Sequence, residues 1–515
     1  MTTTLLVGGT IGRPGRPGRP ADTAMVVAGD RIAWLGAQQD ADASDVDLVV
    51  QLDGGHVTAA FVDAHVHSTA TGLALTGLDL TAAASLGAAL DQVERHARER
   101  RGLGIMLGHG WDETTWPERR PPTRLELDRA SYGSAVYLTR IDVHSAVASS
   151  ALLAAVAAAR PDLPGLPGWS ESGPLTRDAH HAVRTLALAS VTPAQRAGAQ
   201  RATLDRCAEL GIAAVHEMGG PHLSSAEDFA SILELGQGPG PMVFGYWGEL
   251  GGVERARELG ALGAAGDLFA DGALGSHTAY LRAVYADTDG CGFAYLGAGQ
   301  VRDHVVACSA AGIQAGFHVI GDAALDVVVA GFTAAADRVG VEAVRAGGHR
   351  LEHVEMPDAG HLAALARLGV HASVQPVFDA LWGGADDMYA ARLGRQRAQA
   401  MNPFAAMASA GLTLAFGSDS PVTGLGPWHA VRAAVNHRTP QSALPVQAAF
   451  DAHTAGGWQA AGVLGEGRLE PGAPASYAVW DGEADLSAAG AGTAPQCLRT
   501  TVRGRTIWTR QGALA

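Results

Sequence analysis

The sequence has little that would point to an exported protein or to a nucleic-acid-binding protein. Its four cysteines lie far apart in a chain of 515 residues and form no CxxC pair. They are expected to be reduced, mostly buried thiols, which fits the cytoplasm. Acidic residues outnumber basic ones, 52 to 37, so the formal net charge is −15. This charge argues against nucleic acid or an anionic membrane surface as a partner.

Long apolar runs are also missing. The alanine-rich stretch Ala146–Ala159 is too short, and too interrupted by serine, to span a bilayer. The first residues lack the basic and apolar regions of a signal peptide. Hydrophobic residues make up 47% of the chain and charged residues 17%, as in ordinary globular proteins. We therefore predict a cytoplasmic protein without a membrane partner.

The pattern of strand-like and helical runs changes twice along the chain. Residues 1–56 and 465–515 consist of short strand-like runs separated by glycine- and aspartate-bearing turns, and we expect them to pair into one small β-sandwich domain. The Gly-Arg-Pro repeat at Gly12–Pro20 is expected to be a loop. Residues 57–464 alternate apolar runs with helical stretches, which is typical of βα units around a parallel sheet. This region exceeds the ~250 residues of a typical (β/α)8 barrel, so an insertion is predicted near 112–190, where prolines cluster.

Residues that bind metals or move protons follow several of the apolar runs. Val57–Val62 is typical of a buried strand, and His65 and His67 come directly after it. Residues two apart on a strand point to the same side, so both imidazoles can reach one ion. Five later runs end in comparable residues: His109 and Asp112 after 105–107, His216 after 212–215, His318 and Asp322 after 313–317, His353 after 350–352, and Asp419 after 412–416.

If the apolar runs are barrel strands, the His and Asp residues that follow them can form one active site. Active sites of this fold lie at the carboxyl ends of the strands. Three or four nitrogen and oxygen ligands leave a position for water, and a divalent metal lowers the pKa of that water toward ~7. A carboxylate beside the water takes its proton and later delivers it to the leaving group. Asp419, after the last run, fits this role.

Eight motifs in this chain resemble those of the amidohydrolase superfamily. The similarity is to the branch of metal-dependent hydrolases (amidohydrolase family 3) that includes N-substituted formamide deformylase-like proteins. The motifs occur in the family's order and span nearly the whole chain. They are Phe61–His67, Gly110–Asp112, Arg140–Ala146, Phe269–Ser276, His318–Asp322, Leu351–His353, Ser373–Pro376 and Gly417–Pro421.

The resemblance implies a fold and a site. The fold is a (β/α)8 barrel with insertions and a β-sandwich built from both termini. Around one or two metal ions, most simply zinc, it implies the ligands His65, His67, His318, His353 and Asp419. It makes Asp419 the general base and acid, and gives His353 a role as ligand or as the group that holds the attacking water. The substrate pocket would be lined by Trp111, Asp112, Arg140, His144 and His216, with Asp271 in a turn that shapes it.

The chain departs from the family pattern at one position. Many relatives carry a lysine two residues before the Phe269 motif, carboxylated so that it bridges two metals, whereas this chain has Asp267 there. Aspartate cannot be carboxylated and has a shorter side chain. We therefore favour one zinc per chain, with a binuclear site bridged by Asp267 as the alternative.

These observations predict a metal-dependent amidohydrolase that cleaves the C–N bond of a small amide or N-formyl compound by means of a metal-activated water. One alternative is a hydrolytic deaminase or cyclic amidase that uses the same residues. The other is a barrel that has lost catalysis and only binds a ligand, an alternative supported by the missing lysine. The resemblance also suggests a homodimer.

Overall fold

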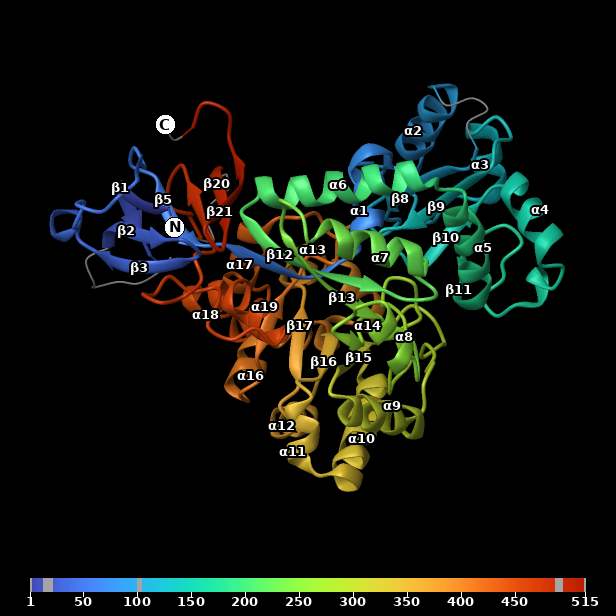
Figure 1. The fold of residues 1–515 in the computed structure, drawn as a ribbon. Coiled ribbons are helices and arrows are strands. Elements are labelled where there is room, and N and C mark those ends of the chain that lie inside the picture. The colour runs from blue at the N-terminus through green and yellow to red at the C-terminus, as the bar shows by residue number, and fades with distance from the viewer. Residues whose placement is uncertain (1, 13–21, 100–103, 487–493, 514–515) are drawn as a thin grey trace.

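The protein has a central barrel with a smaller β-domain on one side and an inserted sheet on the other (Figure 1). The computed structural model describes residues 2–12, 22–99, 104–486 and 494–513. The Gly-Arg-Pro repeat lies outside these residues except for Gly12. In Figure 1 the β-domain combines blue and red strands, so it is made from both ends of the chain.

Eight parallel strands form the barrel. In spatial order they are β6 (Phe61–Val66), β12 (Ile212–Gly219), β13 (Met242–Trp247), β14 (Gly263–Ala264), β15 (Gln314–Val319), β16 (Arg350–His353), β17 (His371–Val374) and β18 (Leu414–Phe416). Every residue of β6, β12 and β15 is buried, which explains their nearly continuous apolar runs.

The barrel closes between its first strand and the segment after its last strand. The amide of Asp419 donates to the His65 carbonyl at 2.8 Å, and the amide of His67 donates to the Ser420 carbonyl at 3.0 Å. Gly417 permits this approach, because a Cβ at that position would lie 2.6 Å from the His65 nitrogen. The closure therefore brings the ends of the first and last strands into contact.

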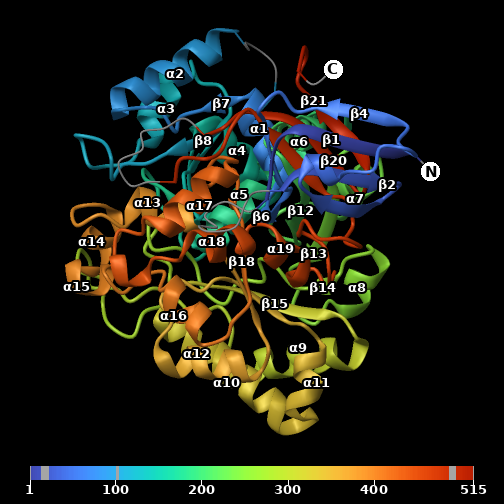
Figure 2. The same cartoon turned by 90° about the vertical axis from the view of Figure 1, so that its left-hand side faces the viewer.

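Helices cover the outside of the barrel, and α9 to α12 lie together along one edge in both views (Figures 1 and 2). The helices of this region are α1 (Ser68–Thr76), α6 (Pro193–Glu209), α7 (Ala226–Leu235), α8 (Val253–Glu258), α9 (Ala298–Ala311), α10 (Asp322–Val339), α11 (Val341–Ala346), α12 (Ala359–Arg367), α13 (Pro376–Trp382), α14 (Met388–Leu393), α15 (Arg395–Ala398), α16 (Phe404–Ser409), α17 (Pro427–Val435), α18 (Val446–Ala452) and α19 (Ala455–Ala460). None of the helices within the described residues is long and apolar enough to cross a membrane.

A five-stranded sheet is inserted between β6 and β12. Its elements are β7 (Leu78–Asp79), α2 (Leu86–Glu99), β8 (Met106–Trp111), α3 (Arg124–Ala130), β9 (Val136–Arg140), β10 (Ser145–Ala148), α4 (Ser150–Ala159), β11 (Leu175–Thr176) and α5 (Arg177–Ala189). The sheet thus begins well before residue 112. The apolar run at 105–107, which its pattern groups with the barrel strands, belongs to β8 of this sheet, because periodicity does not reveal which sheet a strand joins.

The β-domain contains strands from both termini, as expected. They are β1 (Thr3–Ile11), β2 (Asp22–Ala28), β3 (Arg31–Gly36), β4 (Leu48–Gln51), β5 (His56–Ala59), β19 (Tyr477–Trp480), β20 (Cys497–Val502) and β21 (Arg505–Thr509). Hydrogen bonds connect all eight into one sheet, where the sequence predicts a sandwich. All four cysteines are described and are free thiols.

Trp480 joins this domain to the barrel. Its ring is 2% exposed and contacts Trp428 at 5.3 Å and Phe61 at 5.8 Å between ring centroids, and its indole N–H donates to Thr58 Oγ1 at 2.9 Å.

We expect Trp480→Ala to lower the free energy of unfolding by about 3–5 kcal/mol, since it leaves a cavity between the two domains. Urea denaturation measures this loss. Leu464→Ala, at a residue that is 80% exposed, is the control and should change stability by less than about 0.5 kcal/mol; equal effects of the two substitutions would contradict the expectation.

Candidate active site and metal centre

Six buried imidazole and carboxylate side chains converge at the carboxyl ends of the barrel strands. They are His65 on β6 and His67 just after it, Asp267 after β14, His318 on β15, His353 on β16 and Asp419 after β18. They include all five ligands implied by the family motifs. The sixth is Asp267, which the structure places among them, at the point where the family pattern has lysine.

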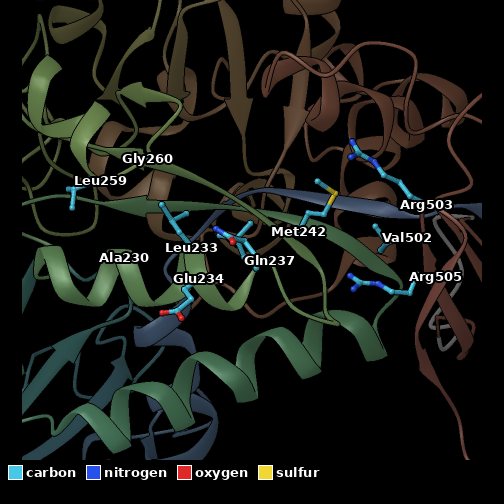
Figure 3. Close-up of a pocket in the computed structure, with 12 residues that line it drawn as sticks. Ala230, Leu233, Glu234, Gln237, Met242, Leu259, Gly260, Val502, Arg503 and Arg505 are labelled. Atoms are coloured by element: carbon cyan, nitrogen blue, oxygen red, sulfur yellow. The ribbon is translucent and has the colours of Figure 1, made fainter. Parts of the chain in front are cut away.

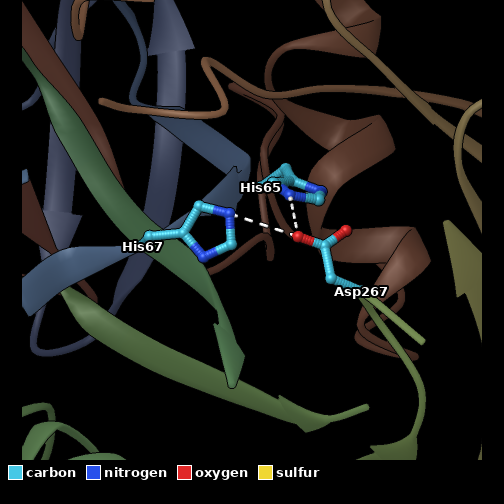
Figure 4. Close-up of side chains that lie close together, drawn as sticks. All are labelled: His65, His67 and Asp267. Carbon is cyan, nitrogen blue, oxygen red and sulfur yellow. Dashed lines mark ion pairs between the residues drawn. The ribbon is translucent and has the colours of Figure 1, made fainter. Parts of the chain in front are cut away.

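The Asp267 carboxylate lies between two pairs of histidines. Its Oδ2 is 3.4 Å from His65 Nε2 and 3.2 Å from His67 Nε2 (Figure 4). Its Oδ1 is 3.6 Å from both His318 Nδ1 and His353 Nε2. The loop that carries Asp267 approaches Gly248 so closely that a Cβ there would lie 2.8 Å from the Asp267 carbonyl carbon. Each oxygen of this carboxylate therefore faces its own pair of imidazoles.

The outer nitrogen of each of these histidines is held by a hydrogen bond. His65 Nδ1 donates to Glu352 Oε2 at 2.9 Å, and His353 Nδ1 donates to Gln375 Oε1 at 2.8 Å. His67 Nδ1 and His318 Nε2 donate to backbone carbonyls, at 3.1 Å and 3.2 Å. Such bonds fix the tautomer that leaves the inner nitrogen with a lone pair, as in metal sites of other proteins.

The inner atoms fit a divalent metal. His65 Nε2, His318 Nδ1 and Asp267 Oδ1 are buried and have no hydrogen-bond partner in the described structure. Unpaired buried polar atoms are costly unless something binds them. Imidazole and carboxylate are ligands that zinc and related ions accept. The cluster is therefore built to hold a divalent metal, and Glu352 and Gln375 are outer partners that the motifs contained but sequence reasoning did not single out.

Asp419 is positioned by the barrel closure. Its Oδ1 lies 3.3 Å from His65 Nε2 and 3.2 Å from His67 Nε2. Its φ is 55° and that of His353 is 69°, a left-handed backbone that is uncommon for non-glycine residues. Burial acts to raise the pKa of the Asp419 carboxyl, but His65 and His67 outweigh burial and hold that pKa well below its usual range. Asp419 is thus an ionised carboxylate directed at the cluster.

A cavity of about 340 Å³ opens beside the cluster. His67, Glu217 and Pro421 lie at the cluster end, and the remaining wall is mostly apolar. A smaller space of about 20 Å³ lies directly over the cluster, where His144 and Arg184 face its imidazole and carboxylate side chains. Burial, and next the neighbouring His318, lower the pKa of His144 to about 3, so its imidazole is neutral. Of the residues predicted to bind substrate, His144 is the one that lines the space over the cluster.

Arg140 also borders the cluster, and Trp111 and Asp112 contact its guanidinium. The Arg140 guanidinium is buried and contacts Asp112 at 3.0 Å, Glu113 at 2.9 Å and Asp142 at 2.8 Å. The Trp111 indole is 1% exposed and donates to the Leu138 carbonyl at 2.9 Å within the core of the inserted sheet. Neither Trp111 nor Asp112 lines the two spaces beside the cluster.

His216 and Asp271 are structural in this arrangement. His216 is fully buried, and its Nδ1 accepts a hydrogen bond from Arg350 at 2.9 Å. Asp271 accepts hydrogen bonds from the amides of Ile320, Gly321 and Tyr280 at 2.8–3.0 Å, which fixes the loop after β14 against β15. Neither side chain lines the spaces described above; the Asp271 carboxylate and the Nδ1 of His216 have partners within the protein.

Another cavity, of about 720 Å³, lies between α7, β13 and the β-domain (Figure 3). Its lining includes Glu234, Met242, Arg503 and Arg505 but no histidine and no member of the cluster. Despite its volume it does not contain the residues for metal chemistry, so the active site is assigned to the cluster.

Comparison with known proteins shows the family of this chain. The model of the family described as "Amidohydrolase family" matches residues 48–507. The chain belongs to the amidohydrolase family. The resemblance noted in the sequence is thereby confirmed, as is the predicted (β/α)8 barrel with an additional β-domain.

Relatives of this amidohydrolase include an N-substituted formamide deformylase from Arthrobacter pascens, which is 26% identical over 95% of both chains. The protein LONG AFTER FAR-RED 3 from Arabidopsis thaliana is 25% identical over 85% of this chain and 78% of its own length. Among solved structures, an uncharacterized metal-dependent hydrolase from Pyrococcus horikoshii OT3 superimposes with a TM-score of 0.72 and 25% identity, covering 94% of this chain and 98% of that one.

Proposed function

We propose that this amidohydrolase cleaves the C–N bond of a small amide or N-formyl compound. The observation that carries the proposal is the cluster itself: His65, His67, His318 and His353 direct their inner nitrogens at Asp267 and Asp419, next to a cavity of about 340 Å³. A cavity of this size accommodates a small molecule. The sequence similarity to an N-substituted formamide deformylase supports an amide as the substrate.

We propose that the cluster holds two divalent ions, most simply zinc, rather than the single zinc favoured by the sequence. One position would be formed by His65 and His67 with Asp267 Oδ2, and the other by His318 and His353 with Asp267 Oδ1. A divalent ion bound there would lower the pKa of water and polarise the amide carbonyl. Aspartate would thus occupy the bridging position of the family's carboxylated lysine.

The chain's own residues account for the proton transfers. Asp419, ionised and buried beside His65 and His67, accepts a proton from the attacking water. The same carboxyl then donates that proton to the amide nitrogen as the C–N bond breaks, so the amine leaves as a neutral product. His144, kept neutral by burial, lies over the cluster and offers an uncharged hydrogen-bonding group to the substrate.

The proposal is tested with the zinc-loaded protein and a panel of four substrate types. These are N-formyl and N-acetyl derivatives of benzylamine, N-formyl amino acids, a cyclic amide, and nucleobases with an exocyclic amine. We expect release of an amine or amino acid, complete loss of this activity after metal removal by a chelator, and recovery on adding zinc. Ring opening or ammonia release alone would favour a cyclic amidase or a deaminase. A folded, metal-loaded protein that turns over none of the panel would contradict an enzymatic role.

A further inference from the structure

We infer that Arg184 binds a carboxylate of the substrate, so that the amide hydrolysed by this protein carries both a carboxylate and an apolar group. This inference rests on the proposed function and specifies its substrate class. Arg184 belongs to α5 of the inserted sheet and is half-buried. It lines both the cavity of about 340 Å³ and the small space over the metal-binding cluster, so it lies where the two meet.

Arg184 has no carboxylate partner among the described residues. The carboxylates nearby are engaged elsewhere: Glu217 accepts from the Ser68 amide at 2.9 Å, and Asp228 accepts from Gln200 at 2.7 Å. Asp142, which borders the small space, pairs with Arg140 at 2.8 Å. The charge of Arg184 acts to lower the pKa values of Tyr137, His180 and His181.

These three neighbours do not balance its charge. Burial raises the pKa of Tyr137 above its usual range, so the phenol stays neutral. Burial also lowers the pKa of His181 to about 3, helped by His222 and Arg184. The pKa of His180 is lowered for the same main reason, and its Nε2 is 2.6 Å from the Tyr137 hydroxyl. The guanidinium is therefore a cation beside neutral groups, at the border of a cavity.

Other arginines around the site have carboxylate partners, so the lack of one for Arg184 among the described residues is informative. Arg140 contacts three carboxylates, Arg350 contacts Glu352 at 2.6 Å, and Arg392 contacts Glu113 and Asp287 at 2.9 Å and 2.6 Å. These three arginines are paired with carboxylates, whereas Arg184 in the cavity has no carboxylate partner among the described residues; Arg196, at the same cavity, donates to Ser225 Oγ instead. A planar guanidinium binds a carboxylate through paired hydrogen bonds.

The remaining wall indicates the rest of the substrate. Apolar side chains from α1, β8, α5 and the segments after α5 and β12 line the cavity: Leu73, Ala74, Leu107, Leu188, Val191 and Leu223. A substrate with its amide at the cluster, its carboxylate at Arg184 and a hydrocarbon or aryl group against this wall would fill all three environments. N-acylated apolar amino acids have this combination of groups.

Two probe pairs test the inference. The first compares kcat/KM for N-formylphenylalanine, as both enantiomers, with N-formylphenethylamine, which lacks only the carboxylate; formate release measures both. The second compares the binding of 3-phenylpropionate and 3-phenylpropanamide to the zinc-loaded protein by calorimetry. We expect the carboxylate to be preferred by about 10- to 100-fold in each pair, the range given by hydrogen bonds to a charged group.

Arg184→Gln should bring both ratios close to one without changing the metal content. Arg196→Gln is the matched control, because Arg196 lines the same cavity but donates to Ser225 Oγ at 3.3 Å; it should retain both preferences. A wild-type ratio near one, or a preference that survives in Arg184→Gln, would overturn the inference. The second result would place the carboxylate at the metal or at Arg196, the other arginine of the cavity, and the Arg196→Gln variant would distinguish the two. If no amide is hydrolysed but carboxylate binding depends on Arg184, the proposed function fails and the anion site stands.

Discussion

Replacing Asp419 with asparagine is expected to lower kcat by about 100- to 10,000-fold, the range that a positioned general acid–base group contributes. Asparagine has the shape of aspartate and keeps one oxygen near His65 and His67, but it cannot accept a proton from water or deliver one to the amine. Barrel closure should survive, because it uses the backbone of this residue: the Asp419 amide donates to the His65 carbonyl at 2.8 Å, and the Val422 amide donates to the Asp419 carbonyl at 2.7 Å.

The measurement is steady-state turnover of the best amide in the substrate panel, together with metal content and circular dichroism. Glu355→Gln is a matched control. Glu355 is a buried carboxyl beside the cluster, burial raises its pKa to about 7, and it accepts from the Tyr389 hydroxyl at 2.6 Å, a bond that glutamine can keep. This control should lose less than about tenfold in kcat. An Asp419→Asn protein that folds, keeps its metal and matches the wild-type rate would remove Asp419 from the proton transfers.

The clustering of the proposed metal ligands could be predicted because each signal is local. His65 and His67 follow a buried strand two residues apart, and His318, His353 and Asp419 each end a further apolar run. In a parallel barrel all strands present their carboxyl ends on the same face, so residues at these ends meet whatever the helices between them do. The structure brings these five residues together.

The inserted sheet was much harder to predict. Its strand β8 has the same apolar pattern as a barrel strand and ends near His109, which does reach the cavity and lies 2.8 Å from the Pro421 carbonyl. Nothing local distinguishes the two sheets. Arg184 sits in an ordinary amphipathic helix, and only the packing of that helix over the barrel mouth places it beside the cluster.

Substrate-binding predictions such as Trp111 and His216 illustrate the same limit. Both follow or lie within strands of the expected pattern, yet each side chain is buried against protein partners, Leu138 and Arg350. A motif shows which residues lie near a site but not which way each side chain points. Asp267 shows the converse: its shorter side chain led the sequence analysis to favour one zinc over a bridge by Asp267, whereas the loop after β14 brings the carboxylate within 3.2–3.6 Å of all four imidazoles.

Because the Asp267 carboxylate lies so close to the four imidazoles, replacing it is expected to have a large effect on metal content. Protein purified without chelator and without added metal should contain about two divalent ions per chain, as in sites where a carboxylate joins a pair of ions. Asp267→Ala should contain one ion or fewer, because both oxygens that face the histidine pairs are removed, and amide hydrolysis should fall with the metal. Inductively coupled plasma mass spectrometry measures the ions, including whether they are zinc.

Asp267→Asn separates loss of ligation from loss of packing, because it keeps the side-chain volume and removes only the charge and one oxygen. It should lose metal as Asp267→Ala does while its thermal unfolding stays closer to that of the wild type. Glu355→Gln should retain the wild-type metal content, since Glu355 belongs to none of the groups that could hold an ion. One zinc per chain in both the wild type and Asp267→Ala would show that Asp267 does not bridge, and would return the site to a mononuclear centre in which His65, His353 and Asp419 lie close enough together to share an ion.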